Sequence, residues 1–165
     1  MTFVIEQVSD ATQLRRAFGC FPSGVTALCA EVDGAPAGMA ASSFTSVSLS
    51  PALVSVCIQN SSTTWPVLRQ RAVLGVSVLA EGQDALCRQL ASRSADRFAG
   101  IEWAAAPSGA IFIDGSTVIM ECTVHEELSA GDHVVVLLEV QGLHARPETA
   151  PLVFHGSSYR RLAPG

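Results

Sequence analysis

Charged side chains are scarce in this sequence. Asp, Glu, Lys and Arg make up 15% of the 165 residues, against roughly 25% in a typical soluble domain. The mean hydropathy is positive, +0.36. Such a composition fits either a fold with a large core or a surface that another subunit covers. The length suffices for one domain with its own core, so residues 1–165 are expected to form a single domain.

Long apolar runs are also missing. No stretch of about 18 apolar residues occurs, which excludes a membrane-spanning helix. The first residues, MTFVIEQVSDATQLRR, lack a basic region followed by an apolar stretch. The sequence therefore predicts no secretory signal, a cytoplasmic protein and no membrane partner. The net charge is −5 and the basic residues are scattered, so no nucleic-acid partner is expected.

The sequence has no cysteine pair at CxxC spacing. An odd number of widely spaced cysteines in a cytosolic chain is typical of reduced residues that pack in the core. A disulfide framework and a metal site are therefore not expected. The five cysteines are Cys20, Cys29, Cys57, Cys87 and Cys122.

Several common catalytic motifs are absent. No GxGxxG follows a strand-like run, and neither a P-loop nor a GxSxG elbow is present. The four histidines never pair at i,i+4, as the zinc-binding helix of a metalloprotease requires. These absences argue against a Rossmann or Walker phosphate site and against the commonest hydrolase classes.

The apolar pattern predicts a mostly β chain with a few short helices. A helix is expected to begin at Ser9 or Asp10 and to end before Pro22, and others are expected over 63–71 and 82–92. Because helices do not alternate with strands, a closed or nearly closed antiparallel barrel is favoured over a parallel α/β sheet. Strands are predicted over 25–32, 44–49, 53–58, 73–79, 117–128, 133–143 and 152–155, with 129–132 as a hairpin turn.

The most unusual feature is an uncharged run. Residues 34–68 contain no Asp, Glu, Lys or Arg but are rich in hydroxyls. A neutral, half-apolar surface of this kind suits a ligand with a flat aromatic body and a polar tail. About half of the strand positions in this run face outward, so an uncovered monomer would associate, and a homodimer is predicted. Two clusters of hydroxyl residues stand out within the run, the first Ser42, Ser43, Thr45, Ser46 and Ser48 and the second Ser61, Ser62, Thr63 and Thr64.

The second hydroxyl cluster falls where a strand is predicted to end and a helix to begin. Backbone N–H groups and hydroxyls there can hold a phosphate, but capping of the helix by Ser62 or Thr63 explains the same residues. Arg93 and Arg97 fit either an anion site or a solvated helix end. His133 could simply open a strand after its turn. Both interpretations stay open on the pattern alone.

An ordered set of segments resembles the flavin reductase-like family, the short reductases of two-component flavin monooxygenases. The signature segment is Gly38-Met39-Ala40-Ala41-Ser42-Ser43-Phe44-Thr45-Ser46-Val47-Ser48-Leu49-Ser50-Pro51. The resemblance covers about residues 10 to 162. Its other parts are Phe21-Pro22-Ser23-Gly24-Val25, Asn60-Ser61-Ser62-Thr63, Val78-Leu79-Ala80 with Gln83, Asp96-Arg97-Phe98-Ala99-Gly100, Glu121-Cys122, Gly131-Asp132-His133 and Pro151-Leu152 with Tyr159-Arg160-Arg161-Leu162.

The resemblance implies a homodimeric split β-barrel of the FMN-binding type and a set of site residues. Ser42, Ser43 and the backbone of residues 39–41 would line the flavin ring and ribityl chain. Ser61, Ser62 and Thr63, with Arg97, would hold the flavin phosphate. His133 would stand beside the nicotinamide or the ring edge as the catalytic residue. Further cofactor-binding residues implied in this way are Gly38, Met39, Ala40, Ala41, Leu79, Ala80, Gln83, Phe98, Tyr159 and Arg160, the last two closing the pocket.

The implied activity is hydride transfer from a reduced nicotinamide to FAD or FMN, with FAD favoured over FMN and NADH over NADPH. The reduced flavin would pass to a partner monooxygenase that uses FADH2 or FMNH2. Two alternatives remain at this point. One is a non-catalytic split-barrel protein that binds flavin, and the other is a related flavoprotein reductase with tightly held flavin.

Overall fold

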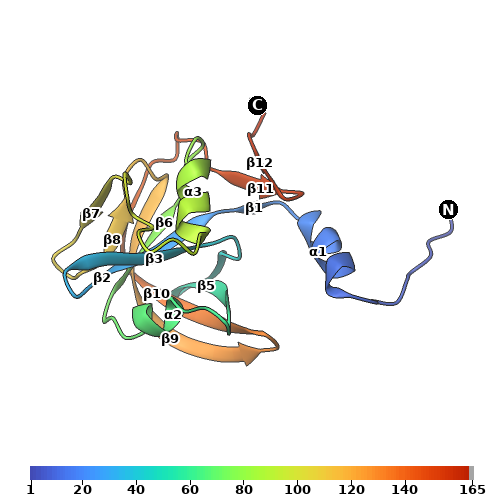
Figure 1. Cartoon of the computed structure of the whole chain (residues 1–165), viewed down its shortest axis with the longest axis horizontal. Helices are drawn as coiled ribbons and strands as arrows, with labels where there is room; N and C mark the ends of the chain where they lie inside the picture. Colours follow the sequence, from blue (N-terminus) through green and yellow to red (C-terminus); the bar gives the residue numbers. More distant parts are fainter. Residues whose placement is uncertain (164–165) are drawn as a thin grey trace.

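Seven antiparallel strands form the main sheet of the computed structural model, which describes residues 1–163 (Figure 1). Their order is β3-β2-β6-β9-β10-β5-β4. The two edge strands, β3 and β4, follow one another in the chain, so residues 42–44 link the two edges of the sheet. The strands span Thr26–Val32 (β2), Ala35–Ala41 (β3), Thr45–Leu49 (β4), Ala52–Gln59 (β5), Leu74–Val78 (β6), Val118–Ala130 (β9) and His133–Ala145 (β10).

Smaller elements surround this sheet. β1 (Ser23–Gly24), β11 (Val153–His155) and β12 (Ser158–Arg160) form a three-stranded sheet, and β7 (Trp103–Ala105) pairs with β8 (Ile111–Ile113). The helices are α1 (Ala11–Gly19), α2 (Trp65–Leu68) and α3 (Asp84–Ala91). The predicted mostly β class with a few short helices is confirmed. In the described residues, none of these helices has the length and apolar character to cross a bilayer.

The long hairpin of β9 and β10 is predicted correctly, and the structure extends it to Ala130 and Ala145. Strand β3, in contrast, is not among the predicted strands, because its sequence APAGMAA has little intrinsic β preference. It forms because each of its residues pairs with β2. The expected helix over 63–71 shrinks to α2, since the chain after Leu68 continues as tight turns with i→i−3 bonds at Gln70 and Arg71.

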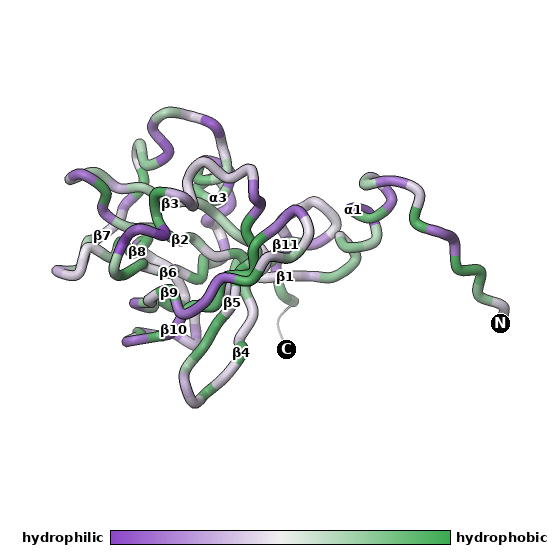
Figure 2. Tube along the Cα trace, turned by 90° about the horizontal axis from the view of Figure 1, so that it is seen from below, coloured by the Kyte–Doolittle hydropathy of each residue, from purple (hydrophilic) through white to green (hydrophobic). Residues whose placement is uncertain are grey.

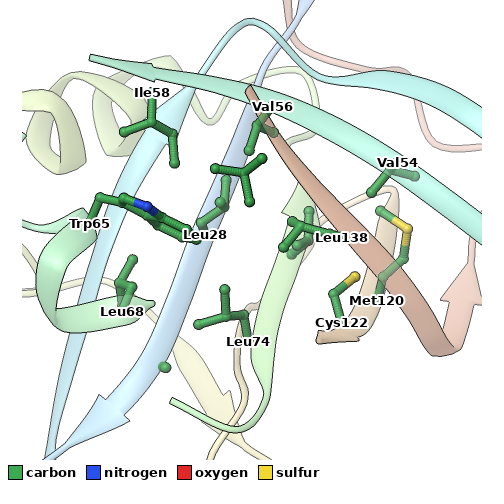
Figure 3. Close-up of a cluster of buried hydrophobic side chains, with 13 residues drawn as sticks. Leu28, Val54, Val56, Ile58, Trp65, Leu68, Leu74, Met120, Cys122 and Leu138 are labelled. Atoms are coloured by element: carbon green, nitrogen blue, oxygen red, sulfur yellow. The ribbon is translucent and has the colours of Figure 1, made fainter. Parts of the chain in front are cut away.

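Two hydrophobic clusters stabilise the fold. The first fills the barrel interior and includes Leu28, Trp65 and Leu74 (Figure 3). The second lies outside the barrel, where β8 packs against β2 and β6 and α3 packs against β3. The close approach of β8 requires Gly75, because a Cβ atom there would lie 2.0 Å from the carbonyl oxygen of Ile111.

The cysteines divide into two groups. Cys29, Cys87 and Cys122 are buried and free, as predicted for packing residues. Burial raises the pKa of the Cys29 and Cys122 thiols to about 12. The packing prediction is wrong for Cys20 and Cys57, which are exposed. Cys57 is on β5 between the buried residues Val56 and Ile58, so the alternation of the strand turns its side chain outward.

Candidate functional site

A cavity of about 800 Å³ opens where the link between β3 and β4 meets the end of β5. The start of α2 and the end of α3 complete its walls. In the described lining the basic side chains are two arginines and one histidine, and no Asp or Glu is present. The lining residues are Met39, Ala40, Ala41, Ser42, Ser43, Cys57, Ile58, Gln59, Ser61, Ser62, Thr63, Thr64, Leu90, Ala91, Arg93, Arg97 and His133.

The first hydroxyl cluster enters the cavity at the β3–β4 link. Ser43 Oγ donates to the Cys57 carbonyl oxygen at 3.0 Å and accepts from the Cys57 amide at 2.8 Å. This side chain therefore ties the link to β5. Ser42, its neighbour, is exposed and lines the same cavity.

The second hydroxyl cluster follows β5. Ser62 Oγ accepts a hydrogen bond from the amide of Trp65, the first residue of α2, at 3.1 Å. The N-cap of α2 is Thr64, which makes no side-chain capping bond, so the capping by Ser62 or Thr63 that the sequence left open is not formed. Ser62 instead accepts from the first amide of the helix. The bond uses Ser62 as an acceptor, so its hydroxyl proton remains able to donate to a ligand.

Arg97 lines the cavity and is held there by two hydrogen bonds. Its Nη1 donates to Thr64 Oγ1 at 2.8 Å and to the Gly38 carbonyl oxygen at 3.3 Å. These bonds hold a half-buried guanidinium between β3 and the start of α2, with its other N–H groups available for a second acceptor. Gly38 makes room for this segment, because a Cβ atom there would lie 2.9 Å from Phe98 Cζ and 2.5 Å from Cys29 Sγ.

His133 reaches the cavity from the first position of β10. Its Nδ1 lies 2.6 Å from Asp132 Oδ1, a contact that fixes the ring orientation. The hydrogen bond and charge of His133 hold the pKa of the exposed Asp132 carboxyl below its usual value. The same turn is tied to the second hydroxyl cluster, because the Asn60 amide donates to the Asp132 carbonyl oxygen at 2.9 Å.

Residues from both hydroxyl clusters and several of the site residues implied by the resemblance thus lie at one cavity, and their chemistry is compatible. Comparison with known proteins identifies the family: a model described as "Flavin reductase like domain" matches residues 18–163. This chain belongs to the flavin reductase-like family. The family predicted from the ordered segments is therefore confirmed.

Relatives in the flavin reductase-like family match over most of their lengths. The chain is 40% identical to an actinorhodin polyketide dimerase of Streptomyces coelicolor, over 88% of this chain and 83% of the relative. It is 34% identical to the reductase subunit of a flavin-dependent monooxygenase of Rhodococcus jostii, over 98% and 83%.

A solved structure of the family also superposes closely. It is the NADH:FAD oxidoreductase of Streptomyces globisporus C-1027 in complex with NAD and FAD fragments. The TM-score is 0.90 at 39% identity, covering 97% of this chain and 98% of the other. The split-barrel fold expected from the sequence is confirmed by this likeness.

Not every residue implied by the resemblance lies at the cavity. Leu79, Ala80 and Phe98 are buried in the outer region of the fold. Gln83 accepts from the Ala80 amide at 2.8 Å and donates to the Asp114 carbonyl oxygen at 2.7 Å, so its amide is occupied by the chain itself. The structure places Gly38 beside Arg97 but outside the lining.

Tyr159 and Arg160 line a separate cavity of about 240 Å³. The Tyr159 hydroxyl donates to Cys87 Sγ at 3.1 Å, and the Arg88 guanidinium lies 5.1 Å from the centre of its ring. Burial raises the pKa of Tyr159 to about 12, so this hydroxyl stays protonated at neutral pH. Within one chain, these two residues do not close the larger cavity.

Some lining residues were not among the predicted site residues. Strand and helix ends supply them, and only the tertiary fold brings those ends together. Thr64 and Arg93 belong to clusters that the sequence singles out, so their residue types gave a usable signal. The others are Cys57, Ile58, Gln59, Leu90 and Ala91.

Proposed function

We propose that this chain is an NAD(P)H:flavin oxidoreductase that reduces FAD or FMN and releases the reduced flavin to a monooxygenase. NADH is the proposed hydride donor. We further propose that residues 1–165 act as one cytoplasmic catalytic domain, of which residues 164–165 lie outside the described part. The observation that carries this function is the single cavity that unites hydroxyls, arginines and His133 in a member of the flavin reductase-like family.

One part of the lining suits the flat ring of a flavin, and another part suits its phosphate. Ala40, Ala41 and Ser42 offer a neutral surface for the flat ring system. β3 is an edge strand that pairs only with β2 in its sheet, so its other edge leaves backbone donors and acceptors for a ligand. Arg93 and Arg97 offer positive charge without a competing carboxylate in the described lining, which suits the phosphate.

Each polar residue has a defined task in this proposal. Arg97, held by Thr64 and Gly38, presents its remaining N–H groups to the phosphate. Ser62 donates its hydroxyl proton to the phosphate or ribityl chain while its oxygen continues to serve the start of α2. His133, oriented by Asp132, positions the nicotinamide at the ring edge.

Flavin and nicotinamide supply the redox chemistry, because the hydride passes directly between them. The protein would therefore act mainly by alignment, with its cavity residues holding the two rings in contact and in a reactive orientation. Backbone N–H groups of the β3 edge would be available to stabilise negative charge on a reduced flavin ring bound there. His133 is not required as an acid, since hydride transfer needs no proton at that step.

FAD is the preferred flavin and NADH the preferred donor in this proposal. The support is the 39% identical Streptomyces oxidoreductase, whose structure holds NAD and FAD fragments. Lining residues such as Ser42, Ser61 and Thr63 are exposed, so the cavity is an open one. An open cavity favours release of the reduced flavin to a partner enzyme over permanent retention.

We also propose that the working form is a homodimer with the cavity near the subunit boundary. On β4, directly after the cavity residues Ser42 and Ser43, Val47 is 49% exposed and Leu49 is 97% exposed. No charged residue protects this edge, and such a surface is normally covered. Light scattering should give twice the 17.3 kDa mass of the chain.

The function is tested by mixing the purified protein with NADH or NADPH, each with FAD, FMN or no flavin. Consumption of NADH only when flavin is added supports the proposal. No consumption with either flavin refutes it and leaves a non-catalytic binding protein. A yellow protein that oxidises NADH without added flavin identifies a flavoprotein with tightly held flavin instead.

A further inference from the structure

The first 20 residues form an arm that stands away from the barrel (Figure 1). Residues 1–10 have no regular structure and are all exposed, and α1 buries none of its residues. The arm joins the rest of the fold at its end, where the Gly156 amide donates to the Gly19 carbonyl oxygen at 2.9 Å. Figure 2 shows apolar segments along this projecting part of the chain.

The arm exposes large apolar side chains. Phe3 is 77% exposed, Ile5 94% and Phe18 70%. In α1, Leu14 and Phe18 are four residues apart and therefore lie on one face, while Arg16 lies on the opposite face. An apolar stripe of this kind is the face that a helix normally packs against a surface.

The start of α1 is well specified. Asp10 Oδ1 accepts from the Gln13 amide at 2.8 Å, and Gln13 Oε1 accepts from the Ser9 amide at 2.8 Å. This reciprocal pair closely matches a capping box. Even so, an isolated helix of nine residues is marginal in water. A capped helix that packs on nothing in its own chain needs another surface to be stable.

The solvent-accessible surface area of the chain shows how much surface is left for a partner to cover. The described chain exposes 10083 Å², whereas a compact monomer of its mass exposes about 7,800 Å². The excess is roughly 2,300 Å² per chain, and a stable interface needs only about 1,000 Å² from each partner. The arm and the apolar β4 edge therefore leave enough surface for an obligate contact.

We propose that the arm packs against a second copy of this chain, whose own arm packs back in the same way. In the proposed homodimer a second copy is present throughout, whereas a monooxygenase needs to bind only when it collects reduced flavin. An apolar arm left open between such encounters would promote aggregation. The second copy also offers an apolar, uncharged surface at Val47 and Leu49.

This inference rests on the proposed homodimer and adds the element that joins it. By twofold symmetry, each arm and its receiving surface would occur twice in one closed assembly. The helix of one chain would thus be stabilised by the barrel of the other. Dissociation should expose and unfold both α1 helices.

The test uses full-length protein. A benzophenone side chain is placed at position 18, and the protein is mixed and re-equilibrated with copies labelled with ¹⁵N before irradiation. Cross-links between labelled and unlabelled peptides support the proposal. Cross-links confined within one chain, or none, overturn it. Amide exchange provides a second readout, and the α1 amides should be protected in the unmodified dimer.

A matched pair of variants completes the test. Phe18→Ser should weaken the dimer at least tenfold, and Arg16→Ser on the opposite face should leave it unchanged. A dimer with rapidly exchanging α1 amides overturns the arm contact alone. A monomer at all concentrations overturns both the arm contact and the dimer. Because the readouts are mass and exchange, a failure of NADH oxidation would refute the enzyme function without touching this inference.

Discussion

Ser43 lies opposite Cys57 of β5, and its side-chain hydroxyl makes the two hydrogen bonds that the backbone of a paired strand would make with Cys57. The register of β4 and β5 pairs Thr45 with Ser55, so two residues earlier Ser43 faces Cys57. Its hydroxyl donates to the Cys57 carbonyl oxygen and accepts from the Cys57 amide. One side chain thereby extends the pairing of β5 into the link that closes the barrel at the candidate flavin cavity.

Ser43→Ala removes both of these hydrogen bonds. Because water can replace part of the loss, we expect a fall in the free energy of unfolding of about 1–2 kcal/mol. Urea denaturation measures this change, and Ser42→Ala is the matched control because Ser42 is exposed on the same link. Equal stability of the two variants would show that the Ser43 bonds do not hold the link.

Arg97→Ala should weaken flavin binding by about ten- to a hundredfold, since hydrogen bonds to a charged group contribute about 1.5–3 kcal/mol. Fluorescence titration with FAD gives the dissociation constant. Arg97→Lys should recover only part of the affinity, because a lysine cannot bridge Thr64, Gly38 and a phosphate with one planar group.

The control for Arg97 is Arg146→Ala, which removes the same charge from a residue that lines a different cavity. Its flavin affinity should match that of the unmodified protein. Equal weakening by both variants would indicate an effect of net charge and would remove Arg97 from the flavin site.

The cysteines should react unequally with a thiol reagent at neutral pH. The raised pKa of Cys29 and Cys122, about 12, keeps these thiols protonated until the solution becomes strongly alkaline. Cys20 and Cys57 are exposed and should react first. Saturating FAD should protect Cys57, which lines the cavity, but leave Cys20 reactive.

Peptide mass spectrometry after brief labelling checks this pattern. Cys20 serves as the control within the same molecule, because it lies in the arm and outside the cavity. Unchanged labelling of Cys57 in saturating FAD would place the flavin elsewhere.

His133→Ala should raise the apparent KM for NADH severalfold and lower kcat less, because His133 is proposed to dock the nicotinamide rather than to transfer a proton. Steady-state kinetics at saturating FAD separate the two effects. His144→Ala is the control, since His144 lines another cavity. A loss of flavin affinity with normal KM for NADH would assign His133 to the flavin site instead.

Local patterns were sufficient for most strands of the barrel, the edge strand β4 included, but not for the other edge strand, β3. The alternation in β9, β10 and β5 reflects strands with one buried face, so their positions follow from the sequence. β3 carries Pro36 and Gly38, both poor strand formers, and exists because β2 pairs with it. Only Asp33 and Gly34 separate the two strands, so the pairing is a local hairpin whose Asp-Gly turn is visible in the sequence, whereas the composition of β3 itself is not that of a strand.

The residues of the candidate site likewise divide into those that the sequence indicates and those that only the tertiary fold reveals. Ser42, Ser62 and Arg97 attract attention because hydroxyls and cations are concentrated in an uncharged neighbourhood. Cys57 and Gln59 could not be found in this way, since their contact with the cavity depends on where β5 ends relative to β10. The separation of Tyr159 from the cavity is likewise a property of the tertiary fold.

One molecule of a reductase that releases its product should reduce many flavin molecules in turn. The most direct measurement is an anaerobic reaction of a trace of protein with a large excess of FAD and of NADH, followed by the flavin and nicotinamide absorbances. We expect all of the FAD to be bleached, with one NADH consumed per FAD. Bleaching that stops after one flavin per chain, or that never begins, would contradict it.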